Sequence, residues 1–112
     1  LLGICRGMQF LQDYFEIPLD IVNGHVGIRH KLNVKKDLKL TKFLEKYIDV
    51  NSFHNLGTKQ STNSLLASST SKDGVVMSLE HSNINVFGIM WHSERENPFK
   101  EEDKNLFRHI FC

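Results

Sequence analysis

The hydrophobic and polar residues of this chain follow two different spacings, and each spacing predicts a different kind of element. Apolar residues in short runs or in strict alternation predict strands, and apolar residues three or four positions apart predict helices. An Asp-Gly pair at residues 73–74 lies between two strand-like runs and predicts a hairpin turn. The expected strands and extended segments are residues 1–4, 30–34, 48–52, 65–69, 75–80 and 86–90.

Three segments carry the spacing that predicts helices. Residues 7–15 form the first, and residues 39–47 hold a short second helix with Thr41 as a cap near its start. The third begins at Asn97-Pro98, because proline suits a first helical turn and the acidic residues that follow favour a helix N-terminus. The apolar members of the first helix are Met8, Phe10, Leu11, Tyr14 and Phe15. The expected buried stripe of the last helix is Leu106, Phe107, Ile110 and Phe111.

A cysteine lies between two glycines where the first strand meets the first helix, in Gly3-Ile4-Cys5-Arg6-Gly7. A G-x-C-x-G turn has the physics of the G-x-S-x-G turn that exposes a nucleophile, and such a strained turn needs small neighbours. The amide groups of the following helix are expected to favour the thiolate form of Cys5. The backbone N–H of Arg6 is expected to hydrogen-bond a developing oxyanion. The alternative is a buried core cysteine beside two incidental glycines.

A second candidate group follows the strand at residues 86–90, in Trp91-His92-Ser93-Glu94. A histidine just past a strand end can reach a nucleophile on a neighbouring strand, and a carboxylate two residues later can hold its other ring nitrogen. Cys5, His92 and Glu94 would then act as nucleophile, base and orienting group. A His-x-Glu pair alone is weak evidence, and the cysteine turn in the same domain strengthens it.

These two motifs together resemble the class I glutamine amidotransferase superfamily, whose usual patterns are G-[IV]-C-x-G-x-Q and G-[VI]-Q-[WF]-H-P-E. Residues 50–55 and 71–80 are similar to the V-N-S-x-H-[HN] and S-x-D-G-x-[IV]-E-[AS]-[IL]-E segments of its γ-glutamyl hydrolase branch, which is peptidase C26-like. The resemblance runs through the chain in the right order. The sequence departs from it at Met77, Met90 and Ser93, where glutamate, glutamine and proline are usual. Ser93 is expected to alter how rigidly the histidine and the glutamate beside it are presented.

The resemblance implies an α/β fold, a three-layer sandwich of flavodoxin-like type, with residues 1–112 as the C-terminal part of a single domain. The chain starts without methionine, four residues before Cys5, so we expect an N-terminal part with several strands and a second oxyanion donor to be absent. We therefore predict that these residues alone are inactive. The resemblance also implies that Gln9, Ser52 and His54 bind the substrate. A solvent-facing Gln9 and a loop histidine without a role are the alternatives.

Composition and charge narrow the partners. With 14 Lys and Arg against 13 Asp and Glu, the chain lacks the charge excess of a nucleic-acid binder, and Lys35-Lys36 is interpreted as a solvated face. No apolar run approaches membrane-spanning length. The two cysteines, Cys5 and Cys112, do not make a disulfide framework, which fits a reducing, cytoplasmic setting. His25 and His30 suggest a metal, yet no further ligand completes a set, so we expect neither metal nor cofactor.

Three functions remain open at this point. The first is a free-standing hydrolase that cleaves a γ-glutamyl amide through a glutamyl thioester, with γ-glutamyl-aminobutyrate or a γ-glutamyl nucleotide amidate as its small-molecule substrate. The second is a glutaminase subunit that supplies ammonia to a partner synthetase, and the third is a non-catalytic fragment or remnant. The intact Cys5, His92 and Glu94 favour an enzyme, and residues 51–55 favour the hydrolase. The sequence does not predict the oligomeric state or the leaving amine.

Overall fold

The central element is a mixed sheet of five strands. The structure, a computed structural model, describes residues 1–112. The strand order is β1 (Leu2–Ile4), β9 (Phe87–Ile89), β8 (Val76–His81), β7 (Leu65–Thr70) and β4 (Asn33–Val34). β1 and β9 are parallel, with Ile4 opposite Ile89, whereas the other neighbouring strands are antiparallel. The strand pairs of this sheet therefore bring the two ends of the chain together.

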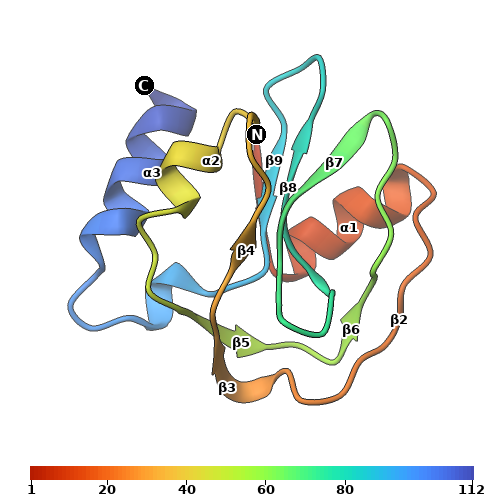
Figure 1. The fold of residues 1–112 in the computed structure, drawn as a ribbon, viewed down its shortest axis with the longest axis horizontal. Helices are drawn as coiled ribbons and strands as arrows, with labels where there is room; N and C mark the ends of the chain where they lie inside the picture. The colour runs from red at the N-terminus through yellow and green to blue at the C-terminus, as the bar shows by residue number, and fades with distance from the viewer.

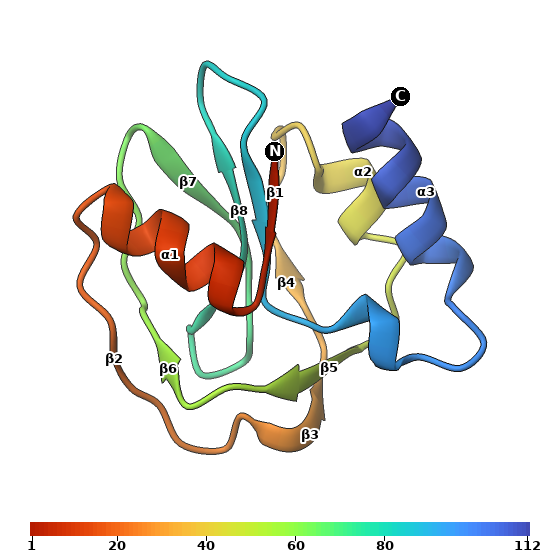
Figure 2. The ribbon, with the colours of Figure 1, turned by 180° about the vertical axis from the view of Figure 1, so that it is seen from behind.

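Helices cover both faces of this sheet. α1 (Arg6–Tyr14) lies on one face, and α2 (Thr41–Leu44) lies with α3 (Glu101–Phe111) on the other (Figures 1 and 2). The predicted α/β fold with three layers is confirmed by this arrangement. A single turn of 3₁₀ helix, η1 (Ser93–Arg95), connects β9 to the segment before α3. No helix has the length and apolar character needed to cross a bilayer.

Two short ribbons lie across the end of the sheet at which α1 begins (Figure 1). One pairs β2 (Asp20–Ile21) with β6 (Leu56–Gly57), and the other pairs β3 (Val26–His30) with β5 (Val50–Phe53). Each ribbon is antiparallel. They bring residues 50–57, which follow α2 in the chain, close to the start of α1.

The strand predicted at residues 30–34 is wrong as one element. β3 ends at His30 and pairs with β5, whereas β4 begins at Asn33 and pairs with β7. The chain leaves one ribbon at Lys31 and enters the main sheet two residues later, so the alternating pattern covers parts of two sheets. Periodicity along the chain does not distinguish one strand from two that share a phase.

The second and third helices are both shorter than predicted. α2 has four residues, and Leu40, not Thr41, is its N-cap. The Thr41 hydroxyl instead accepts a hydrogen bond from the Leu38 N–H, at 3.0 Å. The buried carboxylate of Glu80 accepts from the N–H groups of Lys39 and Leu40, so a residue of β8 supplies the capping oxygens. α3 begins at Glu101 and not at the predicted Asn97-Pro98.

The apolar faces of α1 and α3 also differ from the predicted ones. Met8, Leu11 and Gln12 of α1 are buried, with Phe15 packed partly against the same core. This set follows the i, i+3, i+4, i+7 rule, which turns Phe10 and Tyr14 outward, where they are 68% and 71% exposed. At the end of α3, Leu106 is fully buried while Phe111 is 62% exposed.

Candidate functional site

Cys5 occupies a strained turn between β1 and α1. Its φ is 52° and its ψ is −99°, a left-handed backbone that residues other than glycine rarely adopt. The Cys5 N–H donates to the Ile89 carbonyl at 2.8 Å, and its carbonyl accepts from the Gln9 N–H at 2.9 Å. The first bond continues the β1–β9 pairing and the second begins α1. Pairing on one side and the helix on the other therefore hold the predicted nucleophile turn.

The two glycines of this turn have different roles. A Cβ at Gly3 would lie 2.6 Å from the carbonyl carbon of Gly7, so only glycine lets the helix start this close to the strand. A Cβ at Gly7 would meet nothing within 4 Å. The prediction that the turn needs small neighbours is therefore correct for Gly3 and wrong for Gly7. Gly88, paired with Gly3, makes room for the Met8 side chain.

The prediction that α1 favours a Cys5 thiolate does not describe the net effect. Cys5 is 8% exposed, and its burial raises the pKa of the thiol above the ordinary value. The Arg6 backbone N–H lies against the thiol and lowers this pKa, but by less than burial raises it. The resting group is therefore a thiol, and a nearby base must remove its proton before it can act as a nucleophile.

His92 and Glu94 emerge from β9 at the same edge of the sheet as Cys5, because β1 and β9 are parallel neighbours. The His92 Nδ1 and the Glu94 Oε2 are 2.6 Å apart. Partial burial raises the pKa of Glu94, but hydrogen bonds from its own backbone N–H and from His92 outweigh this and hold the pKa below its ordinary value. An ionised carboxylate only accepts hydrogen bonds, so Nδ1 carries the proton and Nε2 presents a lone pair.

Asn51 of β5 clamps the backbone of His92. Its Nδ2 donates to the His92 carbonyl and its Oδ1 accepts from the His92 N–H, each at 2.8 Å. Glu96 lies 3.4 Å from the same Nδ2 and binds the Arg29 guanidinium at 2.7 Å. The Asn51 side chain thus imitates a neighbouring strand for one residue. This role was not predicted from the sequence, although Asn51 lies within a segment that resembles the γ-glutamyl hydrolase branch.

The residue before His92 is anchored to α3. Trp91 is 1% exposed, and its Nε1 donates to Asp103 at 3.1 Å. The Tyr47 hydroxyl donates to the same carboxylate oxygen at 2.5 Å, and burial raises the pKa of Tyr47. Nothing in the sequence pattern pointed to Asp103, because a lone aspartate at a helix start is ordinary. Ser93, on the other side of His92, is also buried, and its hydroxyl has no hydrogen-bond partner.

The predicted substrate-binding residues lie together near the start of α1. Gln9 Nε2 and His54 Nδ1 both hydrogen-bond the Leu56 carbonyl, at 3.1 Å and 2.9 Å. His54 is 4% exposed, its burial lowers its pKa, and its Nε2 has no partner. Ser52 is fully buried, and its hydroxyl donates to the His25 carbonyl at 3.0 Å. The alternative of a solvent-facing Gln9 without a contact does not hold.

A second histidine group supports this region from beneath. His25 is fully buried, stacks on His30 and His54, and lies 2.9 Å from Asp73. Burial raises the pKa of Asp73, but hydrogen bonds from Ser71 and His25 outweigh it and lower the pKa to about 2. No group of three histidine, cysteine or acidic side chains is arranged to hold a metal ion.

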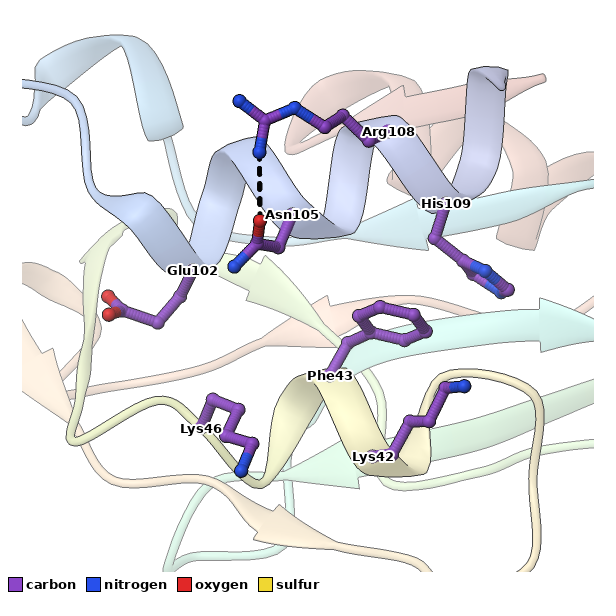
Figure 3. Close-up of a pocket in the computed structure, with 7 residues that line it drawn as sticks. All are labelled: Lys42, Phe43, Lys46, Glu102, Asn105, Arg108 and His109. Carbon is purple, nitrogen blue, oxygen red and sulfur yellow. Dashed lines mark hydrogen bonds between the residues drawn. The ribbon is translucent and has the colours of Figure 1, made fainter.

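A groove of about 640 Å³ lies elsewhere, between α2 and α3 (Figure 3). Phe43 and His109 stack across it with their ring centroids 4.3 Å apart, and Arg108 donates to Asn105. Its remaining lining residues are Lys42, Lys46 and Glu102. None of the predicted site residues lines this groove, so it is separate from the Cys5 site.

Comparisons with known proteins agree with the motifs. The Peptidase C26 family model matches residues 1–94. The γ-glutamyl-CDP-amidate hydrolase of Campylobacter jejuni is 38% identical over 97 residues, covering 87% of this chain and 44% of the relative. Protein NtpR of Enterococcus hirae is 28% identical, covering 96% of this chain and 52% of the relative. The chain spans about half the length of the curated relatives it matches.

Solved structures share the fold. A Thermoplasma acidophilum protein assigned to GMP synthase, as one of its subunits, matches with a TM-score of 0.81 and 21% identity, over 97% of this chain and 54% of that one. A glutamine amidotransferase from Thermotoga maritima matches with a TM-score of 0.65 and 17% identity, over 96% of this chain and 46% of that one. At these identities the likeness concerns the fold alone.

Proposed function

The chain belongs to the Peptidase C26 family of the class I glutamine amidotransferase superfamily, and on that premise we propose that it carries the reacting groups of a γ-glutamyl amide hydrolase. One observation carries the proposal. The strained Cys5 turn and the paired His92 and Glu94 follow two parallel, hydrogen-bonded strands and therefore lie at one edge of the sheet. This is the arrangement that a nucleophile, a base and an orienting carboxylate require.

The proposed reaction begins with proton transfer from the Cys5 thiol to the His92 Nε2. The Cys5 sulfur then bonds to the δ-carbonyl carbon of the glutamyl group, and the Arg6 backbone N–H stabilises the resulting oxyanion. The C–N bond breaks as His92 returns its proton to the leaving nitrogen, which departs as an amine. Water, deprotonated by His92, cleaves the glutamyl thioester, releases glutamate and restores the thiol. Glu94 orients His92 throughout and stabilises its charged form.

The glutamyl half of the substrate is proposed to contact Gln9 and His54. Their N–H groups are engaged with the Leu56 carbonyl, so Gln9 presents Oε1 and His54 presents Nε2, both of which are acceptors. Two acceptors suit the α-ammonium group of a glutamyl moiety. Ser52 stays a predicted contact, and a substrate would have to replace the bond from its hydroxyl to the His25 carbonyl.

The γ-glutamyl substrate class is supported by the Campylobacter relative, whose name specifies a γ-glutamyl-CDP-amidate. We propose a γ-glutamyl nucleotide amidate or γ-glutamyl-aminobutyrate as the substrate. A glutaminase subunit that delivers ammonia to a synthetase is the second candidate. It is favoured by the fold shared with the protein assigned to GMP synthase.

The decisive experiment uses the full encoded protein that contains this chain, because its relatives are about twice as long. Release of glutamate from γ-glutamyl conjugates is compared with release of ammonia from free glutamine, with the variant Cys5→Ala as the control. We expect conjugate hydrolysis that Cys5→Ala abolishes, and labelling of Cys5 but not Cys112 by a glutamine-like chloroketone. Faster turnover of glutamine would favour the glutaminase subunit. Activity that survives in Cys5→Ala would refute the mechanism, and no turnover of either class would favour a remnant.

A further inference from the structure

Arg95 is a cation beside the reacting groups that has no anionic partner. It ends η1, three residues after His92, and its side chain is exposed. Its side chain makes no hydrogen bond or ion pair in the structure. In contrast, the guanidinium of Arg29 is bound by both Asp49 and Glu96. Arg95 therefore has its N–H groups available to a ligand.

Phe53 of β5 fixes where this guanidinium lies. The central carbon of the Arg95 guanidinium is 4.1 Å from the centroid of the Phe53 ring, a cation–π contact. The edge of the same ring meets His92, with centroids 6.3 Å apart and planes at 67°. The Arg95 charge also opposes the rise in the pKa of Cys5 that burial causes. One phenyl ring thus holds the cation and the base on the same side of the site.

The position beside His92 indicates which half of the substrate Arg95 meets. His92 must protonate the departing nitrogen, so groups next to His92 border the leaving amine. The acceptors proposed for the glutamyl half, on Gln9 and His54, gather instead around the Leu56 carbonyl. The family model ends at Glu94, so Arg95 lies outside the part of the chain that the family shares.

We propose that Arg95 binds an anionic oxygen group on the leaving amine and thereby selects γ-glutamyl conjugates whose amine carries a negative charge. A guanidinium held by its face on an aromatic ring keeps its donors free at its edge, where they match the paired oxygens of a phosphoryl or carboxylate group. The inference rests on the proposed function. It names the shared chemistry of the two substrates considered there, the phosphoryl oxygens of a nucleotide amidate and the carboxylate of an aminobutyrate.

The test compares three substrates in the full encoded protein. These are γ-glutamyl-CDP-amidate, γ-glutamyl-aminobutyrate, and the neutral γ-glutamyl-propylamide, which is the aminobutyrate conjugate without its carboxylate. In Arg95→Gln we expect kcat/KM for at least one anionic conjugate to fall about ten- to hundredfold, mainly through KM. The neutral amide should stay within about twofold of the parent protein. Arg95→Lys should recover part of the loss, and the matched control Arg108→Gln in α3 should keep the parent values.

The outcomes separate the sources and the hypotheses. A loss confined to the CDP-amidate identifies the phosphoryl group, and a loss confined to the aminobutyrate conjugate identifies the carboxylate. Equal losses for neutral and anionic substrates would overturn the inference, because Arg95 would then act on Cys5 or on the fold. Unchanged kinetics in Arg95→Gln would overturn it too. If the parent protein cleaves none of the three, the proposed function itself fails and this inference fails with it.

Discussion

At the residue scale, Ser93 is the departure from the family pattern that has a visible structural consequence. Its side chain is buried and its hydroxyl finds no partner, which leaves a polar group without compensation. Its backbone N–H opens a 3₁₀ turn and donates to no backbone carbonyl outside the regular elements. The residue before it, His92, has an extended backbone, with φ −99° and ψ 94°, which a following proline tolerates.

We therefore expect Ser93→Pro to stabilise the protein by about 0.5–1 kcal/mol, because proline restricts the unfolded chain and removes the orphaned hydroxyl. Urea denaturation of the full encoded protein measures this, with Ser93→Ala as the control that removes the hydroxyl alone. Ser93→Pro should be more stable than Ser93→Ala. A loss of stability would mean that the serine N–H or hydroxyl has a partner that the folded structure does not reveal.

The residues that could be predicted from the sequence are those whose chemistry is local. Cys5 is recognisable because its glycines are adjacent, and His92 with Glu94 because they are two positions apart. Asn51 and Asp103 were not predicted, since their partners His92, Tyr47 and Trp91 are distant in sequence or carry no motif. The balance of charge effects on Cys5 was also missed, because burial is a property of the assembled fold.

At the scale of elements, β5 holds the catalytic segment in place through Asn51. We expect Asn51→Ala to lower kcat about ten- to hundredfold with a much smaller change in KM, because the N–H and carbonyl of His92 lose their partners and the base is no longer positioned. Steady-state kinetics with a γ-glutamyl conjugate in the full encoded protein measures both constants.

Asn55→Ala is the matched control for this prediction, because Asn55 is exposed and its side chain makes no hydrogen bond. It should leave kcat unchanged. If Asn51→Ala instead raises KM at constant kcat, Asn51 contacts substrate and does not position His92. A kcat unchanged in both variants would mean that Trp91 and its bond to Asp103 hold the segment without help from β5.

Element prediction succeeded where one segment packs against one partner. The strands that became β7, β8 and β9 and the helix that became α1 were found in this way. It failed at residues 30–34, where the chain crosses from one ribbon to another sheet, and at the cap of α2, which Glu80 supplies from forty residues away. Both errors concern contacts that no local pattern encodes.

At the scale of the whole molecule, the His25–Asp73 pair ties the β3–β5 ribbon to the β7–β8 hairpin. The pKa of Asp73 is lowered from its ordinary 3.8 to about 2, so the ionised carboxylate is favoured by folding. This stabilisation is complete above about pH 4 and is lost as the pH falls through about 2.

We accordingly predict that Asp73→Asn is less stable than the parent protein at neutral pH and that the difference between them shrinks between pH 4 and pH 2. Urea denaturation of the full encoded protein across that range measures it. Asp20→Asn serves as control, because Asp20 is exposed and its side chain is unbonded. A difference between Asp73→Asn and the parent that does not vary with pH would show that the ion pair does not link these two parts.

The glycines at Gly3 and Gly88 give the β1–β9 pair a way of rejecting wrong alignments. A parallel pair that slips by one residue turns each side chain to the opposite face of the sheet. The side chain of Leu2 or Ile4 would then occupy the hollow that the start of α1 needs, because even a Cβ at either glycine lies within 3 Å of its neighbours. The turn at Cys5 can close only in the native alignment, so a misaligned chain brings no thiol to the histidine and folding errors remain chemically silent.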